Sequence, residues 1–170
     1  MHGKNYRAAV GQPYTRKEFI HGSPQPKIAR FTTGNPSDAY DHVYRLVSLE
    51  RAQIRHNALE ACRISVNKIA TTLGETNYFL AIRVYPHVIL KENKMIATAG
   101  ADRLQEGMRK SFGKPTGLAA RVNRGTVILE LGIKGKAVKD AQDALRVAAS
   151  KLPVQTRVEE VGVAAKASGA

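Results

Sequence analysis

The segment from Gly107 to Pro115 comes closest to a phosphate-binding loop. It reads Gly-Met-Arg-Lys-Ser-Phe-Gly-Lys-Pro, so a lysine follows the second glycine, as in the loops that cradle nucleotide phosphates. Its glycines enclose five residues instead of four, and Pro115 stands where a serine or threonine would bind magnesium. Pro115 also disfavours a helical conformation of Lys114, so the helix that should receive the phosphate cannot begin there. The pattern argues against a nucleotide-hydrolysing site.

The other residue types that support catalysis are scattered. The five histidines, His2, His21, His42, His56 and His87, show no metal-ligand spacing. Cys62 is the single cysteine, so no internal disulfide and no thiolate zinc site can form, and a reducing compartment fits. We therefore expect no metal and no cofactor.

Asp102 and Glu106 could share one helical face as a carboxylate pair. Arg103, Arg109 and Lys110 surround them, and local charge neutralisation explains the pair more simply. A nuclease or RNA-modifying enzyme that uses these two carboxylates remains the enzymatic alternative. The expectation from the residues is that the chain is not an enzyme.

Charge is the most informative property of the composition. The chain holds 27 Lys and Arg against 14 Asp and Glu, for a net charge of +13. Such a balance favours binding to polyanions, either nucleic acid or an anionic membrane. A membrane partner would need a span of about 18 apolar residues or an amphipathic helix with bulky residues opposite lysine, and the apolar runs here are short. We expect nucleic acid as the partner, no homo-oligomer, and a cytoplasmic location, since Met1 to Asn5 lacks the apolar stretch of a secretory signal.

The positive charge is concentrated in two segments that contain many glycines and prolines. Residues 1–34 carry six basic and one acidic side chain, and residues 91–124 carry eight and three. Because glycine and proline interrupt long helices and central strands, both segments are predicted to be extended or looped. The predicted organisation is a basic N-terminal arm over 1–34, an α+β domain over 35–161 with a basic glycine-rich loop at about 91–117, and a disordered tail over 162–170.

The nearly neutral segments carry the core pattern. Apolar residues alternate over Val43 to Leu49 and from Tyr78 to Val84, which predicts strands; further strands are expected at 87–90, 126–133 and 154–161, with 126–133 paired to 118–122 through a turn at Asn123 to Gly125. Leu59, Cys62, Val66, Ile69 and Leu73 form one stripe of a helix capped by Asn57 and Glu60 and stopped at Gly74. A second helix is expected over 136–152. The predicted class is α+β, a mixed or antiparallel sheet with two amphipathic helices on one face.

Three groups of side chains could contact RNA, because Arg and Lys bond to phosphates and aromatic rings stack on bases. A solvated loop or a solvated helix face would show the same patterns, so these residues are candidates. In the arm they are Lys4, Arg7, Tyr14, Arg16, Lys17, Lys27 and Arg30; on the first helix Arg55, His56, Arg63 and Asn67; around the loop His87, Lys91, Asn93, Lys94, Arg103, Arg109, Lys110, Lys114, Arg121 and Arg124.

None of the short signatures of compact RNA-binding modules occurs: there is no aromatic RNP strand, no GXXG clamp and no zinc knuckle. Long basic arms without such a module are typical of a protein packed permanently into folded RNA, which is the style of ribosomal proteins. A free-standing DNA- or RNA-binding regulator is the non-enzymatic alternative, and it would give a sequence-selective footprint.

Three runs of the sequence are highly specific: Tyr85 to Lys94 (YPHVILKENK), Ala99 to Arg103 (AGADR) and Gly107 to Gly117 (GMRKSFGKPTG). Through these runs the chain resembles the archaeal and eukaryotic large-subunit ribosomal protein "L ten-e" family, the counterpart of bacterial large-subunit protein sixteen. The resemblance spans about Pro13 to Val161. Supporting matches are Pro13 to Ile20, Lys27 to Phe31, Arg55-His56, Leu59 to Ala61, Arg63 and Asn67.

The resemblance implies a non-catalytic constituent of the large ribosomal subunit that binds large-subunit rRNA near the base of the central protuberance, in the vicinity of 5S rRNA and beside the site of aminoacyl-tRNA. Neighbouring ribosomal proteins would be further partners. The resemblance also implies that the glycine-rich loop extends toward the peptidyl-transfer centre and supports tRNA accommodation. The residues placed near tRNA in this way are Ala101, Asp102, Arg103, Gly107, Arg109, Lys110, Gly113 and Lys114.

Overall fold

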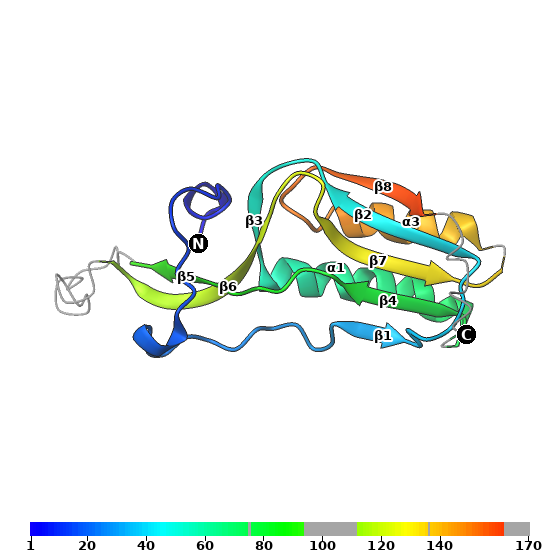
Figure 1. The fold of residues 1–170 in the computed structure, drawn as a ribbon, viewed down its shortest axis with the longest axis horizontal. Coiled ribbons are helices and arrows are strands. Elements are labelled where there is room, and N and C mark those ends of the chain that lie inside the picture. Colours follow the sequence, from blue (N-terminus) through cyan, green and yellow to red (C-terminus); the bar gives the residue numbers. More distant parts are fainter. Residues whose placement is uncertain (75, 94–111, 136, 162–170) are drawn as a thin grey trace, which may run out of the picture.

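A computed structural model of the chain describes residues 1–74, 76–93, 112–135 and 137–161, which form two antiparallel sheets and two α-helices (Figure 1). The strand order is β1-β4-β7-β2-β8 in the five-stranded sheet and β3-β6-β5 in the three-stranded sheet. The elements are β1 (Thr32–Gly34), β2 (His42–Ser48), β3 (Ala52–Arg55), α1 (His56–Ala70), β4 (Tyr78–Ile82), β5 (Val88–Glu92), β6 (Lys114–Val122), β7 (Val127–Ile133), α3 (Val138–Ala149), β8 (Thr156–Val161) and the 3-10 turns η1 (Gly3–Asn5), η2 (Lys17–Phe19) and η3 (Thr71–Leu73).

The expected α+β class is confirmed, with one correction: the strands form two sheets where one was expected. Of the two expected kinds of sheet, mixed or antiparallel, the structure has the antiparallel one, since every strand pair in the described part of the chain is antiparallel. Strands were expected near β2, β4, β5, β7 and β8 and are present there, whereas β4 ends at Ile82, two residues before the predicted Val84.

One bent ribbon of two antiparallel segments joins the two sheets. Residues 42–55 supply β2 and β3, and residues 114–133 supply β6 and β7. Val47 pairs with Val127 in the five-stranded sheet, and Ala52, five residues on, pairs with Val122 in the three-stranded sheet, so the register continues through the bend. The predicted hairpin between 118–122 and 126–133 is therefore wrong. The turn at Asn123 to Gly125 is a corner at which the chain passes from one sheet to the other (Figure 1).

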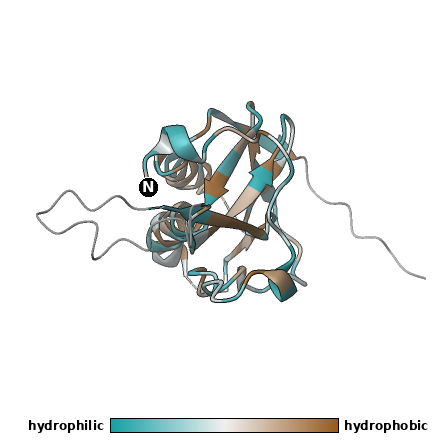
Figure 2. Ribbon diagram, turned by 90° about the vertical axis from the view of Figure 1, so that its left-hand side faces the viewer, coloured by the Kyte–Doolittle hydropathy of each residue, from teal (hydrophilic) through white to brown (hydrophobic). Residues whose placement is uncertain are grey.

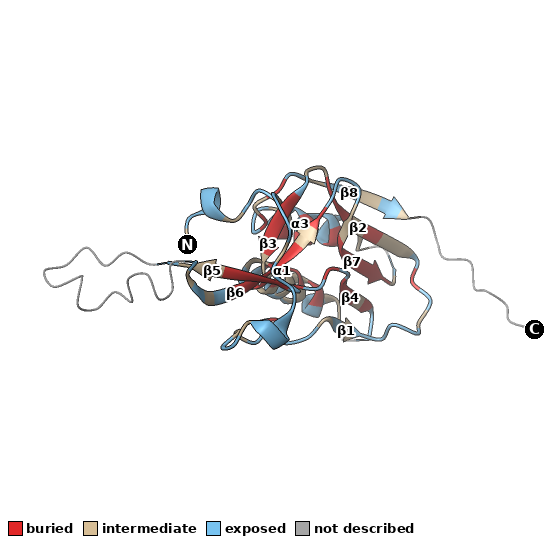
Figure 3. Cartoon of the chain, turned by 60° about the vertical axis from the view of Figure 1, so that its left-hand side comes forward, coloured by how far each residue is buried: buried red, intermediate tan, exposed pale blue. Residues whose placement is uncertain are grey.

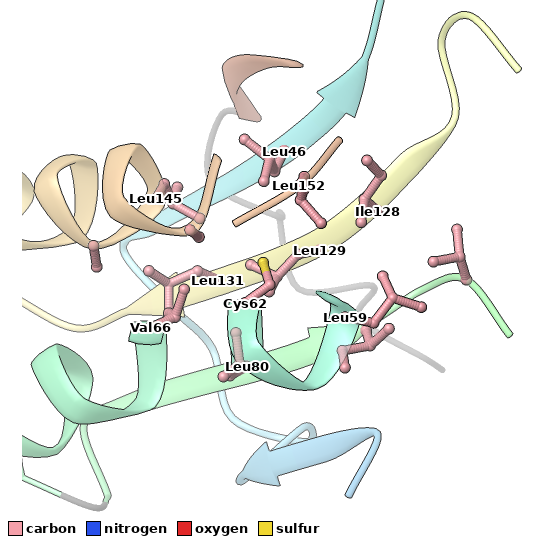
Figure 4. Packing of buried hydrophobic residues seen from close by; sticks show 14 of the residues in the cluster. Leu46, Leu59, Cys62, Val66, Leu80, Ile128, Leu129, Leu131, Leu145 and Leu152 are labelled. Carbon is pink, nitrogen blue, oxygen red and sulfur yellow. The ribbon is translucent and has the colours of Figure 1, made fainter. Parts of the chain in front are cut away.

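The hydrophobic core lies between the five-stranded sheet and the two helices, which cover the same face of that sheet (Figure 1). Figure 4 shows side chains of α1, α3 and the sheet meeting there, among them Cys62, Leu131 and Leu145. Figure 2 shows that the most hydrophobic stretches belong to strands in the middle of the molecule. Burial of this aliphatic surface is the main favourable contribution to folding.

The first helix begins one residue earlier than the proposed cap. Arg55 occupies the N-cap position without a capping hydrogen bond from its side chain, so the assignment of Asn57 as cap and Glu60 as its partner is wrong. Leu59, Cys62 and Val66 of the expected stripe are buried, and Ala70 continues it. Leu73 lies instead in η3, which ends before Gly74 as expected. The second helix is shorter than predicted, Val138–Ala149 instead of 136–152.

Neither of the two helices in the described residues is long and apolar enough to cross a membrane.

Gly34 gives a direct test of the edge of the five-stranded sheet. Its φ is +84°, and a Cβ placed there would lie 2.1 Å from the carbonyl oxygen of Tyr78. Gly125 has φ +85° with no atom within 4 Å of the corresponding position. Gly125→Ala should cost about 1 kcal/mol through backbone strain alone, and Gly34→Ala about 3 kcal/mol because strain and collision add. Urea unfolding of both variants measures the difference; equal losses would contradict the close approach of β1 to β4.

Candidate nucleic-acid interface

The N-terminal arm lies across the three-stranded sheet and is hydrogen-bonded to it by its backbone. The first anchor is Gln53 of β3, whose backbone N–H donates to the carbonyl of Arg7 at 2.8 Å. The Gln53 side-chain amide donates to the carbonyls of Tyr6 at 2.8 Å and Ala8 at 3.2 Å. Gln53 is buried, so these bonds replace its lost contacts with water.

Two further anchors lie on the other strands of this sheet. Arg121 of β6 donates through Nη2 to the carbonyl of Gly11 at 2.9 Å, and the backbone N–H of Ile89 in β5 donates to the carbonyl of Tyr14 at 2.7 Å. The arm is thus held to β3, β6 and β5 in turn, and Figure 1 shows it passing over the small sheet. Because backbone carbonyls accept these bonds, the side chains of the arm remain available to a partner.

The next stretch of the arm is attached to α1. The backbone N–H of Lys27 donates to Nδ1 of His56 at 3.4 Å, and the N–H of Ala29 donates to a carboxylate oxygen of Glu60 at 3.2 Å. These two acceptors stand one helical turn apart, so they lie on the same face of α1. Ile28, between the two donors, is buried against the core.

The attached arm presents basic and aromatic side chains to solvent, and Figure 3 shows it exposed along most of its course. Lys4, Arg16, Lys17, Lys27 and Arg30 are exposed, and within the described residues none of them forms an ion pair. Lys91 of β5 places its ammonium 4.7 Å from the centroid of the Tyr14 ring, and Arg55 lies 5.5 Å from that of Tyr6. Cations over aromatic rings are geometries that also suit stacking with bases.

Acidic side chains near the five-stranded sheet are paired within the fold. Glu130 of β7 is nearly buried and accepts hydrogen bonds from both Arg45 and Arg83. Glu160 of β8 contacts His42, and Asp38 pairs with Lys134 at 2.6 Å. Charge is therefore distributed unevenly over the molecule: ion pairs neutralise it around the large sheet, and unpaired basic groups lie along the arm. A polyanion would be drawn to the arm and the small sheet.

Several predicted contact residues have partners inside the fold. Arg63 makes a bidentate pair with Glu60, with nitrogen–oxygen distances of 2.9 and 2.7 Å. The Asn67 side chain accepts from the hydroxyl of Tyr78, and Arg7 pairs with Glu50. Arg124 donates to the carbonyl of Leu49, where it braces the corner of the ribbon. Apart from Arg7, the exposed candidates of the arm have the fewest hydrogen bonds and ion pairs to other described residues.

His56 is 3% exposed and is the most buried of the predicted contact residues. Desolvation by burial lowers the pKa of His56 below its ordinary value, and the nearby charges of Arg55 and Lys27 lower it further. The neutral ring then accepts the N–H of Lys27 at Nδ1. In this fold His56 holds the arm to α1 and does not offer a surface for RNA.

Some of the predicted loop residues lie within the described part of the chain and others do not. Lys94, Ala101, Asp102, Arg103, Gly107, Arg109 and Lys110 lie outside the described residues. The flanks are described: Glu92 of β5 pairs with Lys114 of β6, and Asn93 and Lys114 are exposed. Gly113 has φ +83°, and a Cβ there would lie 2.6 Å from the carbonyl carbon of Glu92. The backbone segments at Glu92 and Gly113 therefore approach each other closely at this end of the sheet. His87 is exposed beside the start of β5.

Burial and hydrogen bonding shift the pKa values of two further groups. Burial raises the pKa of the Cys62 thiol to about 12, so it does not supply a thiolate nucleophile. The hydrogen bond from Arg63 lowers the pKa of Glu60, which keeps that carboxylate ionised and engaged. Among the described residues, no group of histidine, cysteine and carboxylate side chains could hold a metal ion.

Two residues of this surface were not among the contact residues predicted from the sequence. Gln53 anchors the arm, and its only signal was a polar residue between buried Ala52 and Ile54 in a short strand. Phe19 is 72% exposed on the arm next to Arg16 and Lys17. Its signal in the sequence was an aromatic residue close to Arg16 and Lys17.

Comparison with known proteins identifies similar chains. The family model described as ribosomal protein L16p/L10e matches residues 10–159. The large ribosomal subunit protein uL16 of Hyperthermus butylicus is 53% identical over 96% of this chain and 92% of its own. The protein of that name from Staphylothermus marinus is 57% identical over 90% and 88%, and one from Saccharolobus islandicus 51% identical over 92% and 90%.

The buried His56 predicts a pH dependence of stability. The pKa of His56 is lower in the folded chain than its unfolded value near 6.5. As the pH falls below that value, the unfolded state therefore binds more protons than the folded state does. The stabilisation is complete above pH 6.5 and is lost as the pH falls toward the folded pKa. The free energy of unfolding should therefore decrease between pH 7 and pH 5, and His56→Gln should flatten this decrease. The matched control is His21→Gln at an exposed site; if both variants keep the wild-type slope, the role of His56 is wrong.

Proposed function

The chain belongs to the ribosomal protein L16p/L10e family, and we propose that it binds large-subunit rRNA through the N-terminal arm and the three-stranded sheet. Members of this family are structural proteins of the large ribosomal subunit and not enzymes. The observation that carries the proposal is the arm itself. Its backbone is hydrogen-bonded to all three strands of the small sheet, and its basic side chains other than Arg7 are exposed without ion pairs among the described residues. Phosphate oxygens would supply the missing partners.

The finer placement follows from the family resemblance. The binding region lies near the base of the central protuberance, in the vicinity of 5S rRNA, and faces the aminoacyl-tRNA site. The α+β body serves as a scaffold that holds the corridor through which tRNA is accommodated. The protein works on cytoplasmic ribosomes with neighbouring ribosomal proteins as partners. It needs no second copy of itself, because rRNA supplies the partner surface.

Sedimentation tests the assignment to the large subunit and separates it from the rivals. The protein should travel with the large subunit at moderate salt and leave it as the salt is raised, because each phosphate contact releases counterions. A free-standing regulator or a nuclease that uses Asp102 and Glu106 would remain outside ribosomes. Recovery of the protein only in the unbound fraction at moderate salt would refute the proposal.

Matched charge variants test which part of the surface binds rRNA. Arg16→Ala with Lys17→Ala removes two exposed charges from the arm, and Lys139→Ala with Lys151→Ala removes two exposed charges at and after α3. Binding to large-subunit rRNA should weaken in the arm variant, and the slope of log K against log salt should fall by about two. The α3 variant should bind as the wild type does. Equal losses would mean that net charge alone drives binding.

We further propose that the glycine-rich loop acts on tRNA. Substitution of Arg103, Arg109, Lys110 and Lys114 by Ala together should slow tRNA accommodation or subunit maturation and leave the isolated fold intact, because it removes four positive charges and no apolar side chain. Translation rate and subunit profiles of a strain carrying this variant are the measurements. The control removes four charges elsewhere, at Lys139, Arg146, Lys151 and Arg157. Unchanged translation in the loop variant would refute the role of the loop.

A further inference from the structure

A hollow opens on the surface where the arm passes the edge strand of the small sheet. Its walls include Pro13, Tyr14, Arg16 and Phe19 from the arm and Lys91 from β5. Two aromatic rings and two cations therefore line one concave surface. The hollow lies outside the hydrophobic core, so its residues are not explained by folding.

The walls of the hollow are held in place by the backbone. The carbonyl of Tyr14 accepts the N–H of Ile89 at 2.7 Å, which fixes the arm against β5. Lys91, two residues further along β5, covers the Tyr14 ring at 4.7 Å. Phe19 stands at the end of the short turn η2, where its own N–H donates to the carbonyl of Arg16 at 3.4 Å. The two rings are thus presented by anchored backbone.

Both rings remain largely accessible to solvent. Tyr14 is 51% exposed and Phe19 is 72% exposed. Tyr85 is exposed to a similar extent, but its ring stacks on Phe31 with centroids 5.5 Å apart. For Phe19 the described residues provide no ring partner. A large apolar group left in water next to a concave surface indicates that a ligand covers it.

The chemistry of the lining selects the ligand. Arg16 and Lys91 are the charged side chains that line the hollow, and no acidic side chain of the described chain does so. The ligand must combine a flat aromatic part, for the rings, with a negative charge, for the two cations. A nucleotide has both, since the base can stack while its phosphate is bound by Arg or Lys.

We propose that this hollow is a binding site for a single unstacked RNA nucleotide, with Phe19 and Tyr14 receiving the base and Arg16 and Lys91 its phosphate. The inference rests on the proposed function and adds to it a defined subsite at which the protein contacts a base and not the sugar–phosphate backbone alone. Base stacking of this kind tolerates any base, because every base has a π face.

The test compares two probes of equal charge. One is a short single-stranded RNA, and the other is an abasic ribose–phosphate oligomer of the same length; both are titrated into the full-length protein. Phe19→Ala should weaken binding of the RNA about tenfold and leave binding of the abasic oligomer unchanged. Phe19→Trp should restore RNA binding. Arg16→Ala should weaken both probes to the same extent.

Tyr85→Ala is the control, because it removes a ring that is 52% exposed and lies outside the hollow, and it should change neither titration. Phe19 is exposed, so thermal unfolding of Phe19→Ala should match the wild type and exclude misfolding as a cause. Equal effects of Phe19→Ala on both probes, or none on either, would overturn the subsite. If the wild type bound neither probe nor large-subunit rRNA, the proposed function itself would fail, which is a different result.

Discussion

The structure depends on one bent antiparallel ribbon in which residues 42–47 pair with 127–133 and residues 52–55 pair with 119–122, with one register shift between Leu46 and Val47. Through the bend, the backbone N–H of Ser48 donates to Thr126 and that of Gly125 donates to Ser48, so the corner is hydrogen-bonded as the strands are. The ribbon supplies two strands to each sheet. A displacement of the small sheet would require the core pairing of β2 with β7 to shift, and for this reason the two sheets act as one rigid scaffold.

The two faces of the small sheet are covered in different ways. The helix α1 packs against β3 and β6, and the N-terminal arm binds across the strands through Gln53, Arg121 and Ile89. Binding of the arm leaves few polar groups without partners, because its carbonyls accept hydrogen bonds and its cationic side chains stay in water. Acidic groups are paired around the large sheet, which leaves the excess charge of the described chain on the arm and its neighbouring strands. The geometry thus converts a general basic composition into a directed cationic surface.

Much of this architecture could be predicted from periodicity, and what could not depends on contacts distant in sequence. The α1 stripe of Leu59, Cys62 and Val66 and the alternation in β4 are local patterns, and the structure buries them. In β2 the alternation is lost at its end, where Leu46, Val47 and Ser48 are all buried while Val43 is half-buried. The pairing of 118–122 with 126–133 was wrong because a turn at Asn123 looks the same whether the chain folds back or turns a corner. Glu60 looked like a capping partner, but the N–H of Ala29 and the guanidinium of Arg63 occupy its carboxylate. His56 matched a family motif, yet burial by the arm could not be inferred from its neighbours in sequence.

The most direct test of the central claim is an experimental structure of the large ribosomal subunit that contains this protein, with the rRNA around the small sheet traced. We predict rRNA phosphates at hydrogen-bond distance, about 3 Å, from the side chains of Arg16, Lys17 and Lys91 along the arm and β5. Density that placed the arm and the three-stranded sheet in solvent, with rRNA bound instead against the paired charges of β2, β7 and β8, would contradict it.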